Sequence, residues 1–216
     1  MIVIPAINAR SYEEAKKSLE IIASLREENL WTHIDVSNGT FNAVKSWGTP
    51  DEIKTLLENK AINVEIHLMV DYPETHIAEW IALSFVKRMI IHIETLSFNT
   101  FESIKDECDT RNIDCMLAIT SITPPKALEP YINQCAYFQT LAVAPGESGQ
   151  VFNKKVLETI AFLREKRSDA TIEVDGGINR ENAKWSKERG ANIIVSASYI
   201  LKAQNPVNAY RELKII

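Results

Sequence analysis

Short apolar runs alternate with longer amphipathic segments along the whole chain. The apolar runs are rich in β-branched residues, and they cover residues 2–7, 30–36, 63–70, 88–94, 114–120, 137–143, 171–175 and 192–198. Their length and composition are typical of β-strands. Because many of them are apolar on both faces, they fit a parallel sheet that is covered on both sides.

The segments between these runs carry helix signals. Two segments open with a hydroxyl residue followed three positions later by Glu, which is the spacing of a capping box: Ser11 with Glu14, and Thr49 with Glu52. Further helical patterns cover residues 152–167 and 179–190, and a weaker one lies near residues 124–132. The chain therefore alternates strand and helix from end to end.

Strands that alternate with helices pair in parallel, because each helix provides the crossover to the next strand. Eight strands in 216 residues favour a closed (β/α)8 TIM barrel, an α/β fold in which one domain covers residues 1–216. A doubly wound open sheet is the alternative. In a barrel, reactive groups gather at the C-terminal ends of the strands, so a functional site predicts an excess of polar residues there.

That excess is present in the sequence. Three histidines and three carboxylates lie near the ends of the predicted strands: His33, His67, His92, Asp35, Glu94 and Asp175. His33 and Asp35 are two positions apart, so their side chains point to the same face of one strand. The remaining histidine, His76, falls in a helical segment, where an exposed or capping role is expected.

Two imidazoles and two carboxylates at one rim form a ligand set for Zn²⁺, Mn²⁺, Fe²⁺ or Co²⁺. His33, Asp35, His67 and Asp175 offer such a set from three strands. Taken singly, each is more simply a hydrogen-bonded residue at a wet barrel mouth, because structural networks imitate sites. Taken together, they predict one divalent metal ion held by all four.

Composition and charge narrow the class of protein. The chain is 45% hydrophobic and 25% charged, and its net charge of −5 is spread over both signs, which argues against a nucleic-acid surface or a polybasic membrane patch. The first residues show no basic leader, and their apolar stretch is too short for a signal or a membrane span. Three cysteines without a CxxC pair predict reduced thiols and a cytoplasmic protein: Cys108, Cys115 and Cys135.

Five segments carry a resemblance to a known family. THIDVSNGTF (32–41), EIHLMV (65–70), LAVAPGESGQVF (141–152), EVDGGI (173–178) and ANIIVSASYI (191–200) resemble, in order and spacing, the successive motifs of the ribulose-phosphate 3-epimerase family. The resemblance runs nearly the whole chain. It implies a metal-dependent barrel that inverts C3 of a ketopentose phosphate, and it is the only basis for expecting a homo-oligomer.

The resemblance also implies roles for particular residues. His33, Asp35, His67 and Asp175 match the metal ligands of the family, and Asp35 and Asp175 match its acid/base pair. Epimerisation removes the C3 proton to give an enediolate and returns a proton to the opposite face. This needs one carboxylate on each side of the sugar, and a metal that stabilises the developing negative charge.

The phosphate group of such a substrate is expected near the loops after strands six, seven and eight, on backbone N–H groups and a short helix N-terminus. The candidate substrate-binding residues are His67, Gly146, Glu147, Ser148, Gly149, Gly176, Gly177, Ala197 and Ser198. The glycines are explained equally well as residues of tight strand-to-helix turns.

This chain departs from the family pattern at the phosphate end. The family has Asn-Pro-Gly-Phe-Gly-Gly-Gln where residues 144–150 read APGESGQ, and it has Gly-Ser at Ala197-Ser198, serine at Ala6, and Met-Asp-Gly at residues 37–39. The last change replaces a carboxylate behind the metal ligands by the amide of Asn38. A divergent member is indicated, acting on ribulose 5-phosphate or on a relative such as a ketohexose 6-phosphate.

Two other functions remain open from the sequence. A lyase or decarboxylase acting on a 3-keto sugar phosphate resembles Asp-x-Lys-x-x-Asp at strand two, whereas this chain has Ser37 at the lysine position. A non-catalytic sugar-phosphate-binding barrel is favoured by the altered loop and opposed by the ligand set, because carboxylates crowded without a cation are costly. His92 and Glu94 are either partners that orient the metal ligands or structural hydrogen-bonding residues, and the second interpretation is favoured.

Overall fold

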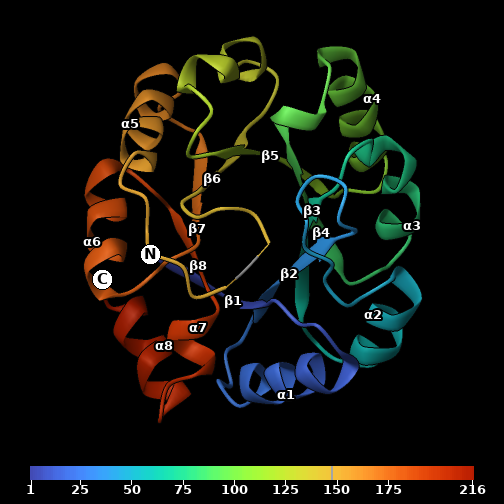
Figure 1. The fold of residues 1–216 in the computed structure, drawn as a ribbon, viewed down its shortest axis with the longest axis vertical. Helices are drawn as coiled ribbons and strands as arrows, with labels where there is room; N and C mark the ends of the chain where they lie inside the picture. The colour runs from blue at the N-terminus through green and yellow to red at the C-terminus, as the bar shows by residue number, and fades with distance from the viewer. Residues whose placement is uncertain (147) are drawn as a thin grey trace.

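Eight parallel strands close into a barrel in the computed structural model, which describes residues 1–146 and 148–216 (Figure 1). The strands are β1 Ile2–Ile7, β2 Trp31–Ser37, β3 Asn63–Met69, β4 Val86–His92, β5 Asp114–Thr120, β6 Tyr137–Leu141, β7 Thr171–Asp175 and β8 Ile193–Ser196. They follow one another in chain order, and β1 pairs with β8. The predicted TIM barrel is confirmed, and the open sheet is excluded by this closing pair.

Helices surround the barrel on its outer face (Figure 1). The α-helices are α1 Tyr12–Ala23, α2 Pro50–Leu57, α3 Ile77–Ile81, α4 Phe98–Asp109, α5 Val156–Lys166, α6 Arg180–Arg189, α7 Ser198–Leu201 and α8 Pro206–Lys214. Short 3₁₀ helices follow three of the strands: η1 Pro73–Thr75, η2 Ile93–Thr95 and η3 Pro125–Tyr131. No helix in residues 1–146 and 148–216 is long and apolar enough to cross a membrane.

The two predicted capping boxes differ in detail. At α2, the Thr49 side chain accepts from the Glu52 backbone N–H, and the Glu52 carboxylate accepts from the Thr49 N–H, as predicted. At α1, Ser11 accepts from the Glu14 N–H, but the Glu14 carboxylate accepts from the N–H of Arg10, one residue earlier, at 2.7 Å. Both arrangements satisfy backbone donors that a helix start leaves free.

Two predicted boundaries change in the structure. The helix expected near residues 124–132 is the 3₁₀ helix η3, because Pro130 inside this segment lacks the N–H that an α-helix needs. Strand β4 ends at His92, so Glu94, expected at the end of the strand, lies in η2 instead. Its side chain therefore leaves the barrel rim in a direction that strand alternation does not predict.

Apolar packing lies mainly between the strands and the helices, whereas much of the barrel interior is polar. The main hydrophobic cluster joins outward-facing strand residues to helix residues such as Leu19, Ile53 and Phe101. Inside the barrel, smaller apolar clusters centre on Ile4 and on Met116. Cys108, Cys115 and Cys135 are buried and free, in agreement with the prediction of reduced thiols.

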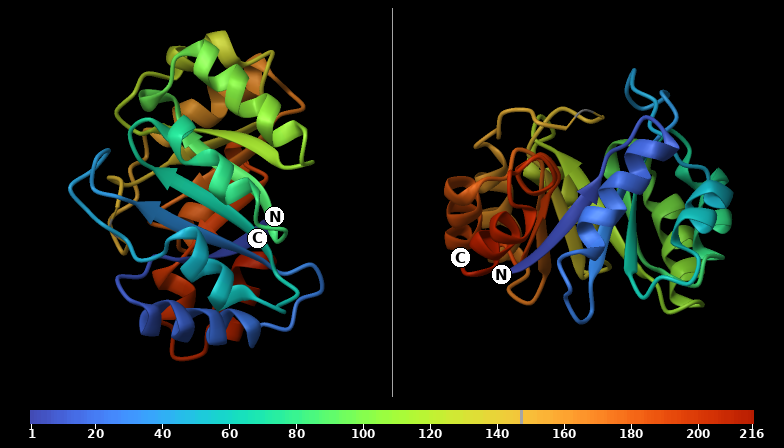
Figure 2. Two further views of the ribbon diagram at one scale, coloured as in Figure 1. Left: turned by 90° about the vertical axis from the view of Figure 1, so that its right-hand side faces the viewer. Right: turned by 90° about the horizontal axis from the view of Figure 1, so that it is seen from below.

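The loops that follow the strands rise from one end of the barrel (Figure 2, right). The loop after β2 and the loop after β6 both project from this end, and they meet over the mouth, where a Cβ on Gly146 would lie 2.8 Å from Val44 Cβ. The polar strand ends described above open toward this mouth. The candidate functional residues therefore lie at this end of the barrel.

Candidate active site

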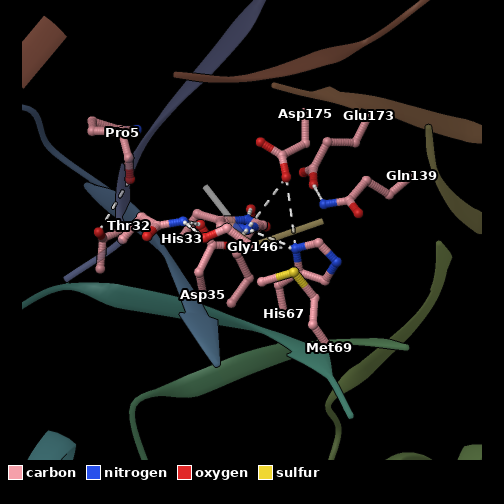
Figure 3. A network of polar contacts seen from close by, with 12 residues as sticks. Pro5, Thr32, His33, Asp35, His67, Met69, Gln139, Gly146, Glu173 and Asp175 are labelled. Carbon is pink, nitrogen blue, oxygen red and sulfur yellow. Dashed lines mark hydrogen bonds and ion pairs between the residues drawn. The ribbon is translucent and has the colours of Figure 1, made fainter. Parts of the chain in front are cut away.

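Two neighbouring strands and one strand across the barrel bring the four candidate ligands together. His33 and Asp35 occupy alternate positions of β2, and the Cα of Asp35 pairs in register with that of His67 on β3. Asp175 is the last residue of β7, across the barrel. Figure 3 shows the four side chains converging inside the mouth. The predicted meeting of these residues is thus seen in the structure.

The distances within this group fit one bound cation. His33 Nε2 lies 3.3 Å from His67 Nδ1, and each of these nitrogens lies 3.2 Å from Asp35 Oδ1. Asp175 Oδ2 lies 3.6 Å from His67 Nδ1 and 3.8 Å from His33 Nε2. Ligand atoms placed about 2.0–2.2 Å from a tetrahedral ion lie about 3.3–3.6 Å from one another. The donor set and its spacing therefore suit the predicted divalent metal, and one ligand atom from each residue lies within 4.8 Å of the others.

Hydrogen bonds orient both imidazoles for this task. His33 Nδ1 lies 2.7 Å from Glu65 Oε1 and donates to it, so Nε2 is the nitrogen that faces Asp35 and His67 and can bind a metal. His67 Nε2 lies 2.9 Å from His92 Nε2, and His92 Nδ1 lies 3.2 Å from Glu94 Oε2. When His92 Nδ1 donates to Glu94, His92 Nε2 accepts from the N–H at Nε2 of His67. Nδ1 of His67 then keeps its lone pair and can bind a metal.

His92 and Glu94 therefore do more than the structural hydrogen bonding expected of them. His92 is fully buried and contacts the candidate ligand His67 directly. Glu94 is fixed in turn by Thr120, whose N–H and hydroxyl both donate to Oε1 at 2.9 Å, and by the hydroxyl of Thr123 at 2.6 Å. The two residues join the candidate metal-ligand group, which consists of His33, Asp35, His67 and Asp175, to the loop after β5.

The environment separates the pKa values of the two aspartates. Burial alone would raise the pKa of Asp35, but hydrogen bonds with His33 and His67 outweigh it and hold the pKa well below its usual range. Burial raises the pKa of Asp175 to about 7, against the opposite charge of His33 and with the like charge of Asp35. One carboxylate is thus kept ionised while the other holds a proton near neutral pH.

The two imidazoles are also different. Burial lowers the pKa of His67 to about 4, so its ring is neutral at neutral pH, as a metal ligand must be. Burial acts in the same direction on His33, but hydrogen bonds with Asp35 and Glu65 outweigh it and raise the pKa of His33 well above the usual value. His33 is therefore a cation among carboxylates until a metal replaces its proton.

Asn8, at the end of β1, is a contact that the sequence reasoning missed. Its Nδ2 donates to Asp35 Oδ2 at 2.7 Å and to the backbone O of Gly146 at 3.3 Å. Because Asp35 Oδ1 faces the two imidazoles, this bond fixes the second oxygen of the same carboxylate. Asn8 thus ties a candidate catalytic aspartate to the loop after β6. The sequence offered one signal for this role, because Asn8 lies two positions after Ala6 and so is expected on the same face of the strand.

A small cavity of about 40 Å³ lies above the metal-ligand group and holds both aspartates in its wall. All the described residues predicted for the phosphate end, apart from His67, line it: Gly146, Ser148, Gly149, Gly176, Gly177, Ala197 and Ser198. Glu147, the remaining predicted residue, lies outside the described residues. His67 is fully buried beneath the cavity, so it lies with the other candidate metal ligands and not in the cavity wall.

This cavity continues into a wider one of about 420 Å³ between α1 and α7. Asn8, Ser148, Ala197 and Ser198 line both spaces, and Lys17 and Lys202 line the outer one together with the carboxylate residue Glu14. A ligand at the metal-ligand group would therefore extend outward past Ser148 and Ser198.

The glycines of the phosphate end separate into two kinds. A Cβ on Gly176 would lie 2.4 Å from Val143 Cγ2, and one on Gly177 would lie 2.7 Å from the backbone N of Phe152; both residues have positive φ. Packing alone therefore requires glycine at these two positions. Gly149 also has positive φ, but a Cβ there would meet no atom of the described residues within 4 Å. Its surroundings leave room for a ligand.

Two departures from the family pattern have a clear place in the structure. The hydroxyl of Ser37 donates to the backbone O of Val44 at 2.7 Å and to Asn42 Oδ1 at 3.0 Å, so it shapes the loop after β2. Asn38 is exposed and accepts from the N–H and hydroxyl of Thr40. The expectation that its amide lies behind the metal ligands is therefore not supported by its contacts.

A second polar group lies deeper in the barrel and was also missed. Glu65, Arg88, Gln139 and Glu173 are buried beneath the metal-ligand group, and Glu65 contacts His33. Burial raises the pKa of Glu173 to about 8, and the nearby charge of Glu65 acts in the same direction. The signal was present in the sequence, since Glu65 and Glu173 precede His67 and Asp175 by two positions and so share their inward face.

Comparison with known proteins gives a consistent family assignment. A model of the ribulose-phosphate 3-epimerase family matches residues 2–201. Curated proteins named ribulose-phosphate 3-epimerase match from Chlamydia muridarum (30% identical, covering 79% of this chain and 75% of the relative) and Mycobacterium leprae (28%, covering 99% and 93%). The protein of that name from Schizosaccharomyces pombe is 26% identical, covering 94% of this chain and 88% of the relative.

Solved structures with similar folds are more distant in sequence. A 3-hexulose-6-phosphate synthase from Salmonella typhimurium superposes with a TM-score of 0.75 at 14% identity, covering 100% of this chain and 97% of the other. An orotidine 5′-monophosphate decarboxylase from Sulfolobus solfataricus gives a TM-score of 0.68 at 18% identity, covering 99% and 96%. At these identities the likeness supports the barrel fold alone.

Proposed function

The chain belongs to the ribulose-phosphate 3-epimerase family and is an isomerase of the carbohydrate-epimerase type, and from this premise we propose how it acts. It inverts C3 of a ketose phosphate, interconverting ribulose 5-phosphate and xylulose 5-phosphate or a closely related pair. His33, Asp35, His67 and Asp175 hold one divalent ion, which is Zn²⁺, Mn²⁺, Fe²⁺ or Co²⁺. Residues 1–216 act as one functional unit.

One observation carries this proposal. Nitrogen and oxygen atoms from four side chains on three strands lie within 4.8 Å of one another, directly beneath a cavity whose wall includes two of them. The two imidazoles are oriented by Glu65 and by His92, in the way that ligand histidines require. When bound there, the ion supplies electrostatic stabilisation of negative charge on the substrate oxygens.

The two aspartates supply the proton transfers. Asp35 from β2 and Asp175 from β7 enter the cavity from different walls, so each can face one side of the sugar carbon. Ionised Asp35 takes the C3 proton at Oδ2, the oxygen that Asn8 holds toward the cavity, and Asp175, whose pKa is raised to about 7, returns a proton from the other side. The reverse reaction exchanges the two roles.

The phosphate is placed over the loops after β6, β7 and β8. The cavity that contains the two aspartates is also lined by Ser148, Gly149, Gly177 and Ser198. Their backbone N–H groups can bind an anion. This binding does not need the asparagine side chain that the family has at the position of Ala144. This arrangement gives the substrate a fixed end and a reacting end. It makes a sugar phosphate the small-molecule partner of the protein.

The lyase or decarboxylase alternative gains no support from the site. At the position where those relatives carry lysine, Ser37 donates to Val44 O and Asn42 Oδ1 and holds the loop after β2. Proton transfer to or from a substrate carbon by a lysine is therefore not available from this position.

Isotope exchange tests the proposal directly. The purified protein, loaded with Co²⁺ or Zn²⁺, is incubated in D₂O with ribulose 5-phosphate, xylulose 5-phosphate and ketohexose 6-phosphates, and the products are followed by NMR. We expect deuterium at C3 together with formation of the C3 epimer for at least one of these sugars. Binding of a sugar phosphate without exchange would favour the non-catalytic alternative, and cleavage of a carbon–carbon bond would favour a lyase.

A further inference from the structure

A buried ionic cluster lies inside the barrel, directly beneath the four candidate metal ligands. Glu65 from β3, Arg88 from β4 and Glu173 from β7 have exposed fractions of 0%, 5% and 0%. Arg88 Nη1 lies 2.8 Å from Glu65 Oε2 and 3.7 Å from Glu173 Oε2. Buried charges are costly to retain and well-packed apolar residues often replace them without loss of stability. Stability alone therefore does not account for an arginine at this position.

We propose that Arg88 is a positioning residue for the metal centre and that it acts on His33 through Glu65. The inference rests on the metal site of the proposed function. The two oxygens of Glu65 have separate partners, with Oε2 at 2.8 Å from Arg88 Nη1 and Oε1 at 2.7 Å from His33 Nδ1. Arg88 thereby fixes the rotation of the Glu65 carboxylate, and the carboxylate fixes the plane of the His33 ring.

The orientation of His33 decides whether it can bind a metal. When Nδ1 donates to Glu65, Nε2 presents its lone pair to the position between Asp35 and His67. A Glu65 side chain that is free to turn no longer selects this ring orientation or this tautomer. The guanidinium is two hydrogen bonds away from the candidate ligand atom, yet it determines how that atom is presented.

Arg88 itself is held rigidly, as a positioning group must be. Its guanidinium lies 4.9 Å from the centre of the Trp31 ring and 5.2 Å from the centre of the Tyr137 ring, so aromatic side chains flank it. Nη2 lies 3.4 Å from Asp114 Oδ2, beside the bond from Nη1 to Glu65. Lysine has the same charge, but it cannot reproduce this planar, two-pronged contact.

The charges around Arg88 explain why a cation is needed there. Glu65, Asp114 and Glu173 all face the guanidinium, while Gln139 adds a neutral partner by donating to Glu173 Oε1 at 3.0 Å. Loss of the guanidinium would leave the Oε2 side of Glu65 facing Glu173 without an intervening cation. Glu65 Oε2 would lose its partner at 2.8 Å, so the rotation of the Glu65 carboxylate would no longer be fixed and its bond to His33 would be weakened.

Metal affinity separates this role from a purely structural one. We would titrate the metal-free protein with Co²⁺ and follow its visible absorption, which needs no substrate and no turnover. Groups that hold ligand histidines in place typically contribute about 10- to 100-fold to metal affinity. We therefore expect Arg88→Met to weaken Co²⁺ binding about 10- to 100-fold, and Arg88→Lys to have a smaller effect.

Arg167 provides a matched control. Its Nη1 donates to the backbone O of Ile132 at 2.6 Å and of Cys135 at 2.7 Å, so it is a partly buried arginine with a structural role away from His33. Arg167→Met is expected to lower the melting temperature while leaving Co²⁺ affinity unchanged. A loss of affinity in this control would mean that general destabilisation, and not positioning, weakens the site.

A double-mutant cycle tests the route through Glu65. Glu65→Gln alone is expected to weaken Co²⁺ binding, and adding Arg88→Met to it should produce no further loss. The double variant removes both partners of a buried ion pair, so it is expected to fold even if Arg88→Met alone does not. An equal effect of Arg88→Met in both backgrounds would show that Arg88 acts by another route and would overturn the inference.

The outcomes distinguish this inference from the proposed function. If the unmodified protein binds no Co²⁺, the metal site of the proposed function is wrong. If it binds Co²⁺ and Arg88→Met binds it within about twofold, the metal site stands and the positioning role of Arg88 is wrong. If Arg88→Met does not fold, the same judgement is made from Arg88→Lys and from the double variant.

Discussion

The two ends of the active site are built in different ways. At the metal end, side chains on β2 and β3 such as His33, Asp35 and His67 are buried and have two or more polar contacts each. At the phosphate end, the loops after β6, β7 and β8 offer mainly backbone groups, with Gly149 and Ser148 beside the cavity. Binding at the metal end therefore requires particular side chains, whereas binding at the phosphate end requires a particular backbone conformation.

This difference explains what a substitution can change at each end. A backbone N–H is present whatever the side chain, so Ser148 and Ala197 can replace the glycines of the family pattern without removing a backbone donor. A ligand imidazole or carboxylate has no such substitute. Selection of the sugar can therefore drift at the phosphate end while the reaction type stays fixed at the metal end.

Replacement of either aspartate is expected to have the largest effect. Asp35→Asn and Asp175→Asn each remove one of the two groups that transfer the C3 proton, so kcat should fall about 10²- to 10⁴-fold. Because the other carboxylate remains, each variant should still exchange deuterium into one epimer without converting it. Kinetics and NMR in D₂O measure the two effects. Circular dichroism spectra of each variant and the kinetics of the exposed control Asp106→Asn exclude general damage, and near-normal turnover would exclude that aspartate as an essential base.

Metal affinity is expected to fall as the pH is lowered. Despite burial, hydrogen bonds with Asp35 and Glu65 raise the pKa of His33 well above its usual value, so below that pKa its Nε2 holds a proton that a metal must displace. His67 contributes none, because burial lowers its pKa to about 4. Displacing the one proton of His33 lowers the affinity for metal about tenfold for each pH unit below the pKa of His33.

Calorimetry provides the measurement for this pH dependence. Titrations of metal-free protein with Zn²⁺, in two buffers with different ionisation enthalpies, give the number of protons released at each pH. We expect about one proton, from His33, to be released at pH 6. An affinity that is constant between pH 5.5 and 8 would contradict the assignment of His33 as a ligand.

The same contrast accounts for how much the sequence predicted. Period-two alternation and the rule that reactive groups lie at strand ends placed His33, Asp35, His67 and Asp175 together, and the structure brings them within reach of one ion. The barrel followed from the count of alternating strands and helices. Both predictions depend on local periodicity, which a single sequence shows directly.

Contacts between distant segments were beyond the sequence pattern. Asn8 donates to Asp35 across 27 positions and to Gly146 across 138 positions, and although alternation predicts which face Asn8 is on, it does not indicate these partners. Glu94 was placed on the rim of β4, but the chain turns into η2 after His92 and directs its carboxylate toward Thr120. Arg88 contacts Glu65 across 23 positions, and only barrel closure places it beneath His33.

Asn8→Ala should have an intermediate effect, because Asn8 connects the two ends. The variant loses the donor to Asp35 Oδ2 and the bond to the loop at Gly146. A hydrogen bond to a charged group contributes about 1.5–3 kcal/mol, so kcat is expected to fall about 10- to 100-fold. Co²⁺ affinity should change little, because Asp35 Oδ1 is untouched.

Asn205→Ala is the matched control for this change. Asn205 caps α8 by accepting from the Asn208 N–H at 3.0 Å, remote from the cavity, so its loss should cost about 1 kcal/mol of stability without altering the kinetics. Unchanged kcat in Asn8→Ala would show that Asp35 needs no orienting donor and that the two ends act independently.

Ser148→Gly is expected to have the smallest effect, and it tests the phosphate end by itself. Ser148 lines both the inner and the outer cavity, so removing its side chain lets an anion approach the backbone more closely. The gain corresponds to a fraction of one hydrogen bond, and KM for the sugar phosphate should fall about twofold while kcat is unchanged. The reciprocal change Gly149→Ala, at a residue with φ +83° and open space around it, should raise KM. If neither variant changes KM, the phosphate does not bind to this loop. The backbone groups that bind the phosphate would then lie elsewhere in the barrel mouth.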